Sequence, residues 1–290
     1  MVGFTFFIWI LKMNQSTRSK KINDLSSKLY AKVERGLANG DIKIDAPLNL
    51  NSLNLALVEV VYSLMADYSS TTNRVTLGYI KKKGKTNKEE SLKDFFDKDK
   101  TEEIKRVKEE FVEKDFSLPI CWYGVENPFQ KRKGARKEDL LLVRGGKYRR
   151  ADVVQSLHSF LNGKGITTLD ELQGEFLRDS NKEFEKSLLG INGIGYVGIC
   201  YLKMLSGLDT FCKPDKHLKD YILNGKDKTG VGERSIQKIM KNVVALLQAD
   251  EKHPKLKYLT IRQLDYMIWK SEKKKAKNSE GKKRKCSCLK

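Results

Sequence analysis

The segment Pro214-Asp215-Lys216-His217 contains the residues most suited to chemistry. A carboxylate held in a fixed position can activate water or stabilise a positive charge that develops in a substrate. Pro214 restricts the backbone directly before Asp215, which helps to fix that position. An aspartate at such a place can also be the N-cap of a helix beginning at Lys216. The two roles can coexist, and the residues alone leave both open.

A glycine turn precedes this segment. Gly193-Ile194-Gly195 interrupts two stretches of apolar residues with helical spacing, which predicts two helices joined by a tight turn over residues 182–205. Both glycines can adopt a positive φ and let a foreign backbone approach, while Ile194 fills the space between the helices. The free amide groups that open the second helix suit a phosphate. The turn therefore predicts a grip on nucleic-acid backbone without base reading.

The composition favours a polyanionic partner. The 290 residues carry 57 Lys and Arg against 37 Asp and Glu, a formal net charge of +20. A chain this basic is typical of proteins that bind DNA or RNA, although an anionic lipid surface is an alternative. Its length allows one large domain or two lobes, each with its own core.

Together, the glycine turn and the aspartate resemble a known family. Leu188-Leu189-x-Ile191-x-Gly193-Ile194-Gly195, followed 20 residues later by Asp215, is similar to the helix-hairpin-helix DNA glycosylases (HhH-GPD), relatives of endonuclease III and 3-methyladenine glycosylase II. The resemblance implies that Asp215 is the catalytic carboxylate. It implies that Gly193, Ile194, Gly195 and Val197 bind the DNA backbone, and that His217 supports the site.

Two departures from the family pattern refine this expectation. Val197 stands where family members that also cut the DNA backbone carry a lysine, so the resemblance implies a monofunctional enzyme that releases a base. Met65 stands where relatives carry a glutamine that wedges into DNA, between matching residues Ser63 and Asn73. An apolar wedge can unstack a base step, but a methionine at helical spacing also suits a core.

No cofactor or metal site is predicted. The five cysteines are irregularly spaced and lack the four-cysteine cluster that binds iron and sulfur in some endonuclease III relatives. Cys286-x-Cys288 could bind a soft metal adventitiously. The three histidines, at positions 158, 217 and 253, indicate no structural metal site.

The expected fold is mostly α, a two-lobed all-helical HhH-GPD glycosylase-like arrangement. We assign 1–21 to an N-terminal extension, 22–50 with 206–272 to a lobe built from both chain ends, and 51–205 to a helical barrel lobe. The barrel lobe includes the helix-hairpin-helix at 182–205 and an insertion at about 76–146. Residues 273–290 are too charged to pack, and we expect a disordered basic tail.

Apolar periodicity predicts the individual helices. They cover residues 22–35, a central core helix within 52–66, two exposed and charge-paired helices within 81–116, a helix following Ala151, one at 235–247, and a last one ending near Trp269. Capping boxes are predicted at Thr168 and Thr260. In the expected insertion, Trp122, Tyr123 and residues 129–137 interleave aromatic and basic side chains, which suits either base stacking or anchoring of a loop.

Residues 2–11 are apolar but too short to span a bilayer. They fit an upstream start-codon assignment, a weak membrane anchor, or a strand or helix packed on the body. The predicted partner is double-stranded DNA rather than a membrane, and the predicted form is a monomer. The expected location is the cytoplasm with the nucleoid, or the nucleus in a eukaryote.

The sequence thus predicts a DNA glycosylase of base-excision repair, a hydrolase that cleaves the N-glycosidic bond of a damaged or mismatched base. The alternative is a non-catalytic helix-hairpin-helix protein that recognises DNA damage.

Overall fold

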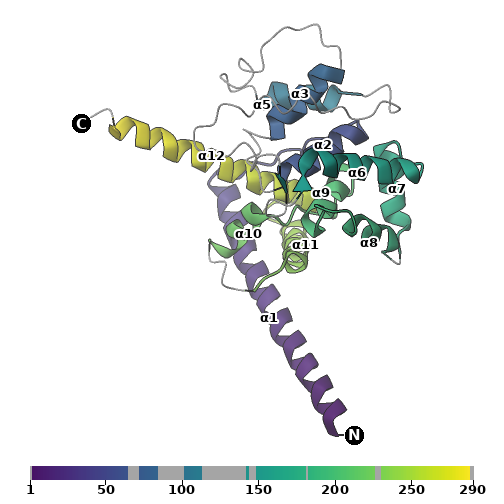
Figure 1. Cartoon of the computed structure of the whole chain (residues 1–290). Coiled ribbons are helices and arrows are strands. Elements are labelled where there is room, and N and C mark those ends of the chain that lie inside the picture. The colour runs from purple at the N-terminus through teal and green to yellow at the C-terminus, as the bar shows by residue number, and fades with distance from the viewer. Residues whose placement is uncertain are drawn as a thin grey trace. The chain divides into compact units, whose positions relative to one another are not determined.

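The computed structural model describes residues 2–64, 72–83, 101–112, 142–143, 148–180, 182–225 and 230–287. These residues are mostly helical, which confirms the predicted all-α class (Figure 1). The chain divides into two compact units, each considered by itself. Unit 1 comprises residues 1–47 and 209–290, and unit 2 comprises residues 48–208.

Unit 1 is built around the packing of α1 (Val2–Ala38) along α11 (Glu233–Ala249) (Figure 1). Helix α10 (Lys216–Leu223), the 3-10 turn η4 (Pro254–Leu256) and α12 (Ile261–Ser287) complete it. Its core consists of aliphatic side chains at helical spacing, among them Leu29, Val33, Ile236, Ile239, Met240, Val243, Leu247, Leu264 and Ile268. The predicted helices at 235–247 and from Thr260 onward are confirmed.

Helix α1 is longer than predicted. We expected residues 22–35 to be helical and found one helix from Val2 to Ala38. No proline interrupts residues 2–38. The helix that carries the buried stripe at residues 22–33 therefore extends to Val2 at its N-terminal end. Among the described residues, no helix combines the length and apolarity needed to cross a membrane.

Helix α2 (Leu53–Ser63) is the centre of unit 2, and all its residues are buried. It packs against α3 (Asn73–Lys83), α6 (Arg150–Gly163) and α9 (Tyr196–Leu205). The other elements are α5 (Thr101–Glu110), α7 (Leu169–Arg178), α8 (Glu183–Leu189), and the strands β1 (Leu142–Val143) and β2 (Tyr148–Arg149), which pair antiparallel. The predicted central core helix is therefore confirmed, whereas α3 was not predicted.

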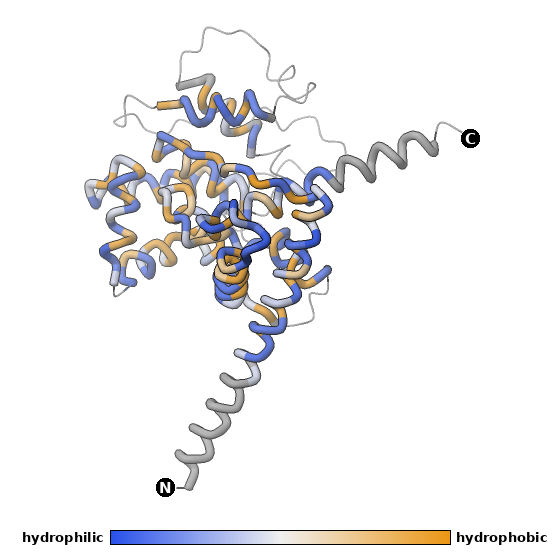
Figure 2. The backbone as a smooth tube through the Cα atoms, turned by 180° about the vertical axis from the view of Figure 1, so that it is seen from behind, coloured by the Kyte–Doolittle hydropathy of each residue, from blue (hydrophilic) through white to orange (hydrophobic). Residues whose placement is uncertain are grey.

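Amphipathic helices give both units their cores. Figure 2 shows hydrophobic and hydrophilic positions alternating along the helices within each unit. The capping boxes at two helix starts are confirmed. Thr168 Oγ1 accepts from the Glu171 N–H while the Glu171 carboxylate accepts from the Thr168 N–H, and Thr260 and Gln263 make the same reciprocal pair.

One prediction about the charged segment 81–116 was wrong. Helix α5 forms within it and carries the expected exposed i,i+4 pair of Arg106 and Glu110, but Lys108 is 1% exposed. Its ammonium donates to the fully buried Glu59 of α2 and, at 2.7 Å, to Asn73 Oδ1. Burial lowers the pKa of Lys108. Apolar periodicity did not reveal this pair, because the spacing of apolar residues does not show that Lys108 meets a counter-charge inside unit 2.

A second correction concerns the C-terminal tail. We expected residues 273–290 to be disordered, whereas α12 continues as a helix to Ser287. Lysine, alanine and glutamate are favourable helix formers, and this stretch contains no proline. The helix therefore extends beyond the last residues that can pack in a core.

We predict that the Lys108→Met substitution destabilises unit 2 by about 3–5 kcal/mol, because it leaves the Glu59 carboxylate buried without its counter-charge. The double variant Glu59→Leu/Lys108→Met should recover most of this loss. Urea denaturation followed by circular dichroism measures both, with Arg106→Met on the exposed face of α5 as the control. Equal losses in Lys108→Met and Arg106→Met would contradict the buried pair.

Candidate functional site

The glycine turn joins α8 to α9 as two helices, in agreement with the prediction. Gly193 has φ +89°, a left-handed backbone conformation that residues other than glycine rarely adopt. Ile194 is 3% exposed and belongs to the core of unit 2, so it fills the space between the helices as expected. Gly193 thus allows the chain to reverse, and Ile194 anchors the reversal.

Gly195 differs from the expectation. It is the N-cap of α9 with φ −121° and ψ −178°, an extended conformation open to any residue. A Cβ atom at Gly195 would meet no heavy atom within 4 Å. The glycine is therefore not required by backbone strain, and the space beside it is open.

The start of α9 presents amide groups at this open space. Tyr196, Val197 and Gly198 are the first helical residues, and their N–H groups precede the first intrahelical bond, which runs from Ile199 N to Gly195 O at 3.1 Å. Gly195 offers no side chain to cap them. Val197 is half-buried and contributes its backbone amide to this group.

Two polar contacts brace the hairpin. Lys203 of α9 donates to Glu185 Oε2 of α8 at 2.7 Å, and the two side chains are 12% and 9% exposed. The Asp179 carboxylate accepts from the N–H groups of Phe184 and Glu185 at 3.0 and 2.9 Å, which caps the start of α8. The Lys203–Glu185 bond thus fixes α8 against α9 in addition to packing, and the Asp179 cap fixes the start of α8.

In unit 1, Asp215 is the N-cap of α10. Its Oδ1 accepts from the Leu218 N–H at 3.1 Å, and its Oδ2 lies 3.4 Å from Lys213 Nζ. The Asp215 N–H donates to the Lys213 carbonyl at 2.7 Å, so a tight turn precedes the helix. The side chain of Asp215 is 25% exposed, neither enclosed in the core nor projecting fully into solvent. The cap interpretation is thus correct, and it leaves part of the carboxylate accessible.

The irregular segment that carries Asp215 is attached to α11 and α12. Gln237 of α11 donates to the Cys212 carbonyl at 2.6 Å and accepts from the Cys212 N–H at 3.3 Å. Arg262 of α12 donates its backbone N–H to the Asp209 carbonyl at 3.1 Å. These bonds fix the path of the chain before Asp215.

Asp265 is the residue of this site that the sequence analysis missed. It lies on α12, where its Oδ2 accepts from the Lys213 N–H at 2.9 Å. Burial raises the pKa of Asp265 to about 7, and the negative charge of Asp215 adds to the rise. The sequence contains an indication of this role, because Asp265 lies on the apolar stripe of Ile261, Leu264 and Ile268. An acid at a buried position needs a hydrogen-bond partner there.

His217, predicted to support the site, is exposed on α10. It lines a pocket of about 380 Å³ together with Lys32, Asp220 and Tyr221. A neighbouring pocket of about 540 Å³ lies between α1 and the C-terminal end of α10. Asp215 lines neither of these two pockets.

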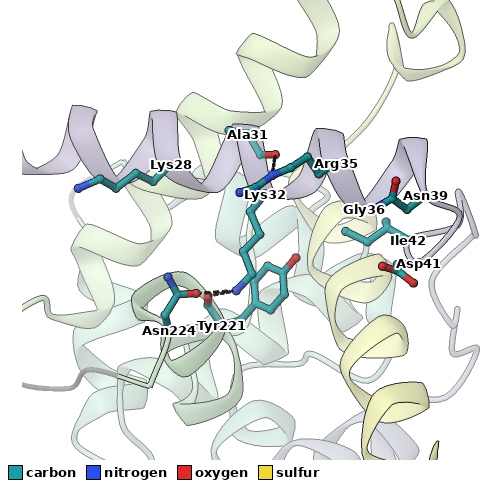
Figure 3. A pocket seen from close by; sticks show the side chains of 10 residues that line it. All are labelled: Lys28, Ala31, Lys32, Arg35, Gly36, Asn39, Asp41, Ile42, Tyr221 and Asn224. Atoms are coloured by element: carbon teal, nitrogen blue, oxygen red, sulfur yellow. Dashed lines mark hydrogen bonds between the residues drawn. The ribbon is translucent and has the colours of Figure 1, made fainter.

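Lys32 occupies the larger pocket. Figure 3 shows its side chain extending from α1 toward Tyr221 and Asn224. Its ammonium donates to the Tyr221 carbonyl at 2.7 Å and to Asn224 Oδ1 at 2.9 Å, and it lies 3.7 Å from the centre of the Tyr221 ring. The end of α10 is the negative end of its dipole, so Lys32 serves to neutralise it rather than to attract an anion.

Among the described residues, Glu34, Asp250 and His253 form a group that could hold a metal ion, with ligand atoms within 4.8 Å of one another. Both carboxylates already have donors. Tyr30 donates to Asp250 at 2.8 Å, which raises the pKa of Tyr30 to about 12, and Lys252 lies 3.1 Å from Glu34. A cation would have to displace Lys252.

Two residues that match the family pattern have hydrogen bonds inside unit 2, and the other candidates lie outside the described residues. Asn73 is buried and accepts from Lys108, and the Ser63 hydroxyl donates to the Val60 carbonyl. The possible wedge Met65 lies outside the described residues. So do Trp122, Tyr123 and the basic stretch 129–137.

Comparison with known proteins yields one family. The model of a family described as a domain of unknown function (DUF8548) matches residues 27–273. The chain belongs to this family. No curated protein and no solved structure matches the chain significantly. The DUF8548 match covers all of unit 2 and residues 27–47 and 209–273 of unit 1, and it includes the glycine turn, Asp215 and Asp265.

Asp265 should make stability depend on pH. The pKa of Asp265 is about 7 in the folded protein and about 3.9 in an unfolded chain. The contribution of Asp265 to the free energy of unfolding is therefore fully present below about pH 3.9 and is lost as the pH rises through 7. Asp265→Asn should therefore gain stability relative to wild type between pH 5 and 8, as measured by urea midpoints. Parallel pH profiles would contradict a buried titrating carboxyl.

Proposed function

We propose that this protein is a monofunctional DNA glycosylase that removes a damaged or mismatched base from duplex DNA. Breaking an N-glycosidic bond develops positive charge on the deoxyribose, which a nearby carboxylate stabilises or relieves by activating water. Asp215 is the carboxylate we assign to this step. The observation that carries the proposal is a partly exposed aspartate held in one orientation, placed 20 residues after a glycine turn.

The contacts of Asp215 support this role. The Leu218 N–H and the Lys213 ammonium each engage one oxygen, so the carboxylate cannot rotate freely. Gln237, Arg262 and Asp265 hold the preceding backbone. A group that is already oriented needs no reorganisation when charge develops on the substrate.

The glycine turn supports a grip on DNA. Open space beside Gly195 and the first amides of α9 suit a phosphate, and the contact would be independent of base sequence. The net charge of +20 favours such a partner. The substrate base would have to leave the duplex, which costs a few kcal/mol and least at a damaged or mismatched pair.

A second candidate is a non-catalytic protein that binds damaged DNA. The specific observation in its favour is that both oxygens of Asp215 are engaged within the protein, and that Asp215 lines neither described pocket. These are the contacts of a helix cap. The two candidates share the DNA grip and differ only in the chemistry of Asp215.

Asp215→Asn separates the candidates. Duplexes carrying one alkylated, deaminated or oxidised base, incubated with protein and then with alkali, should be cleaved by wild type. The asparagine side chain of this variant can still cap the Leu218 N–H but lacks the charge, so cleavage should fall by at least about a hundredfold. Asp220→Asn, a carboxylate paired with Lys216 on the same helix, is the matched control and should stay active.

If wild type binds these duplexes and processes none of them, the second candidate holds and the glycosylase proposal fails. Strand cleavage without alkali would contradict the monofunctional assignment. Borohydride trapping then identifies the amine, and Lys213 is the first to examine because it lies 3.4 Å from Asp215.

Gly195→Ala tests the grip on DNA. The new Cβ meets nothing within 4 Å and the backbone is extended, so the free energy of unfolding should change by less than about 1 kcal/mol. Duplex affinity, measured by fluorescence anisotropy, should nevertheless fall several-fold because the methyl group enters the open space. Gly163→Ala, which also meets open space but lies at the end of α6, is the control. Unchanged affinity in Gly195→Ala would argue against the hairpin as the contact.

A further inference from the structure

Helix α12 carries two different faces. Its apolar face, including Ile261, Leu264 and Ile268, lies in the core of unit 1. The opposite face carries Tyr266, Trp269, Lys270 and Lys273, which are spaced i, i+3, i+4 and i+7 and therefore lie on one side of the helix. All four are half-buried. We call this set the aromatic–lysine stripe.

The rings and ammonium groups of the stripe are ordered against one another. Tyr266 and Trp269 are stacked, with ring centres 5.9 Å apart and planes inclined by 26°. Lys273 Nζ lies 4.9 Å from the centre of the Trp269 ring, and Lys270 Nζ lies 5.9 Å from that of Tyr266. Lys270 also pairs with Asp45.

The core of unit 1 does not include the rings of Tyr266 and Trp269. The aliphatic face of α12 already supplies the packing, so a tyrosine and a tryptophan on the other face leave large rings partly in water. Aromatic rings among cations suit a partner that is both flat and anionic. Nucleotides combine those two properties.

Stacking on a protein ring requires that the bound base be unpaired. In a duplex each base is stacked on its neighbours and offers no face to a protein ring, whereas an unpaired base does. A base that stacks on Trp269 would displace the Lys273 ammonium, which could then neutralise the adjoining phosphate. The exposed Lys274 follows on the same helix and adds positive charge beside the stripe.

We propose that the aromatic–lysine stripe of α12 binds unpaired nucleotides of a single DNA strand. The surface uses none of the residues assigned to base excision or to the hairpin grip. It therefore does not rest on the proposed glycosylase activity, and it is tested without a damaged base.

The test is fluorescence anisotropy of the full-length protein with an oligothymidylate of about 16 nucleotides and with a duplex of equal length. Loss of one stacking ring should weaken strand binding about tenfold, so Trp269→Ala should lose that much affinity for the strand and little for the duplex. Trp269→Phe keeps a ring face and should retain most of the affinity. Circular dichroism checks that each variant is folded.

Tyr258→Ala is the matched control. Tyr258 is 81% exposed and has Lys257 5.9 Å from its ring centre, so this variant removes an exposed tyrosine paired with a lysine outside the stripe. Its strand affinity should equal that of wild type. An equal loss in Tyr258→Ala and Trp269→Ala would overturn the proposal, as would unchanged strand affinity in folded Trp269→Ala.

Two further readouts address the chemistry of binding. Lys273→Met should reduce the slope of log affinity against log salt by about 0.7, the value for one phosphate contact on a single strand. In a Trp9→Phe/Trp122→Phe background, Trp269 is the remaining tryptophan, and its fluorescence should be quenched by the strand. Equal quenching by strand and duplex would contradict the unpaired partner, and tighter binding to oligouridylate would assign the stripe to RNA.

Discussion

The backbone between α9 and α10 has no regular structure, so its polar groups need partners outside the segment. In unit 1 those partners come from the side chains of Gln237 and Asp265 and from the backbone of Arg262. Each bond joins a helix to one part of the loop, and together they determine where Asp215 stands. Every functional interpretation of this aspartate depends on that attachment.

The attachment has an electrostatic cost. Asp265 is buried next to Asp215, and two acids with a single nearby lysine compete for its charge. The raised pKa of Asp265 comes first from its burial, and the negative charge of Asp215 adds to the rise.

In unit 2 the main constraint is the reversal of the chain between α8 and α9. Gly193 supplies the left-handed conformation, Ile194 anchors the turn in the core, and Lys203 with Glu185 braces the helices. Gly195 is left with open space at the start of α9. The first amides of α9 thus lie beside open space, and amides at the start of a helix are suited to an anion.

The sequence by itself determined the helical class, both capping boxes, the two helices around the glycine turn and the position of Asp215 ahead of a helix. These features depend on contacts between residues close in the chain, which periodicity and cap chemistry reveal. Only the tertiary structure decided that Asp265 supports the Asp215 segment and that Lys108 is buried with Glu59. Lys213 and Asp265 are 52 positions apart in the chain, and Glu59 and Lys108 are 49 positions apart. A charged residue is stable in a core only when a distant partner meets it there, and a linear pattern does not record which partner that is.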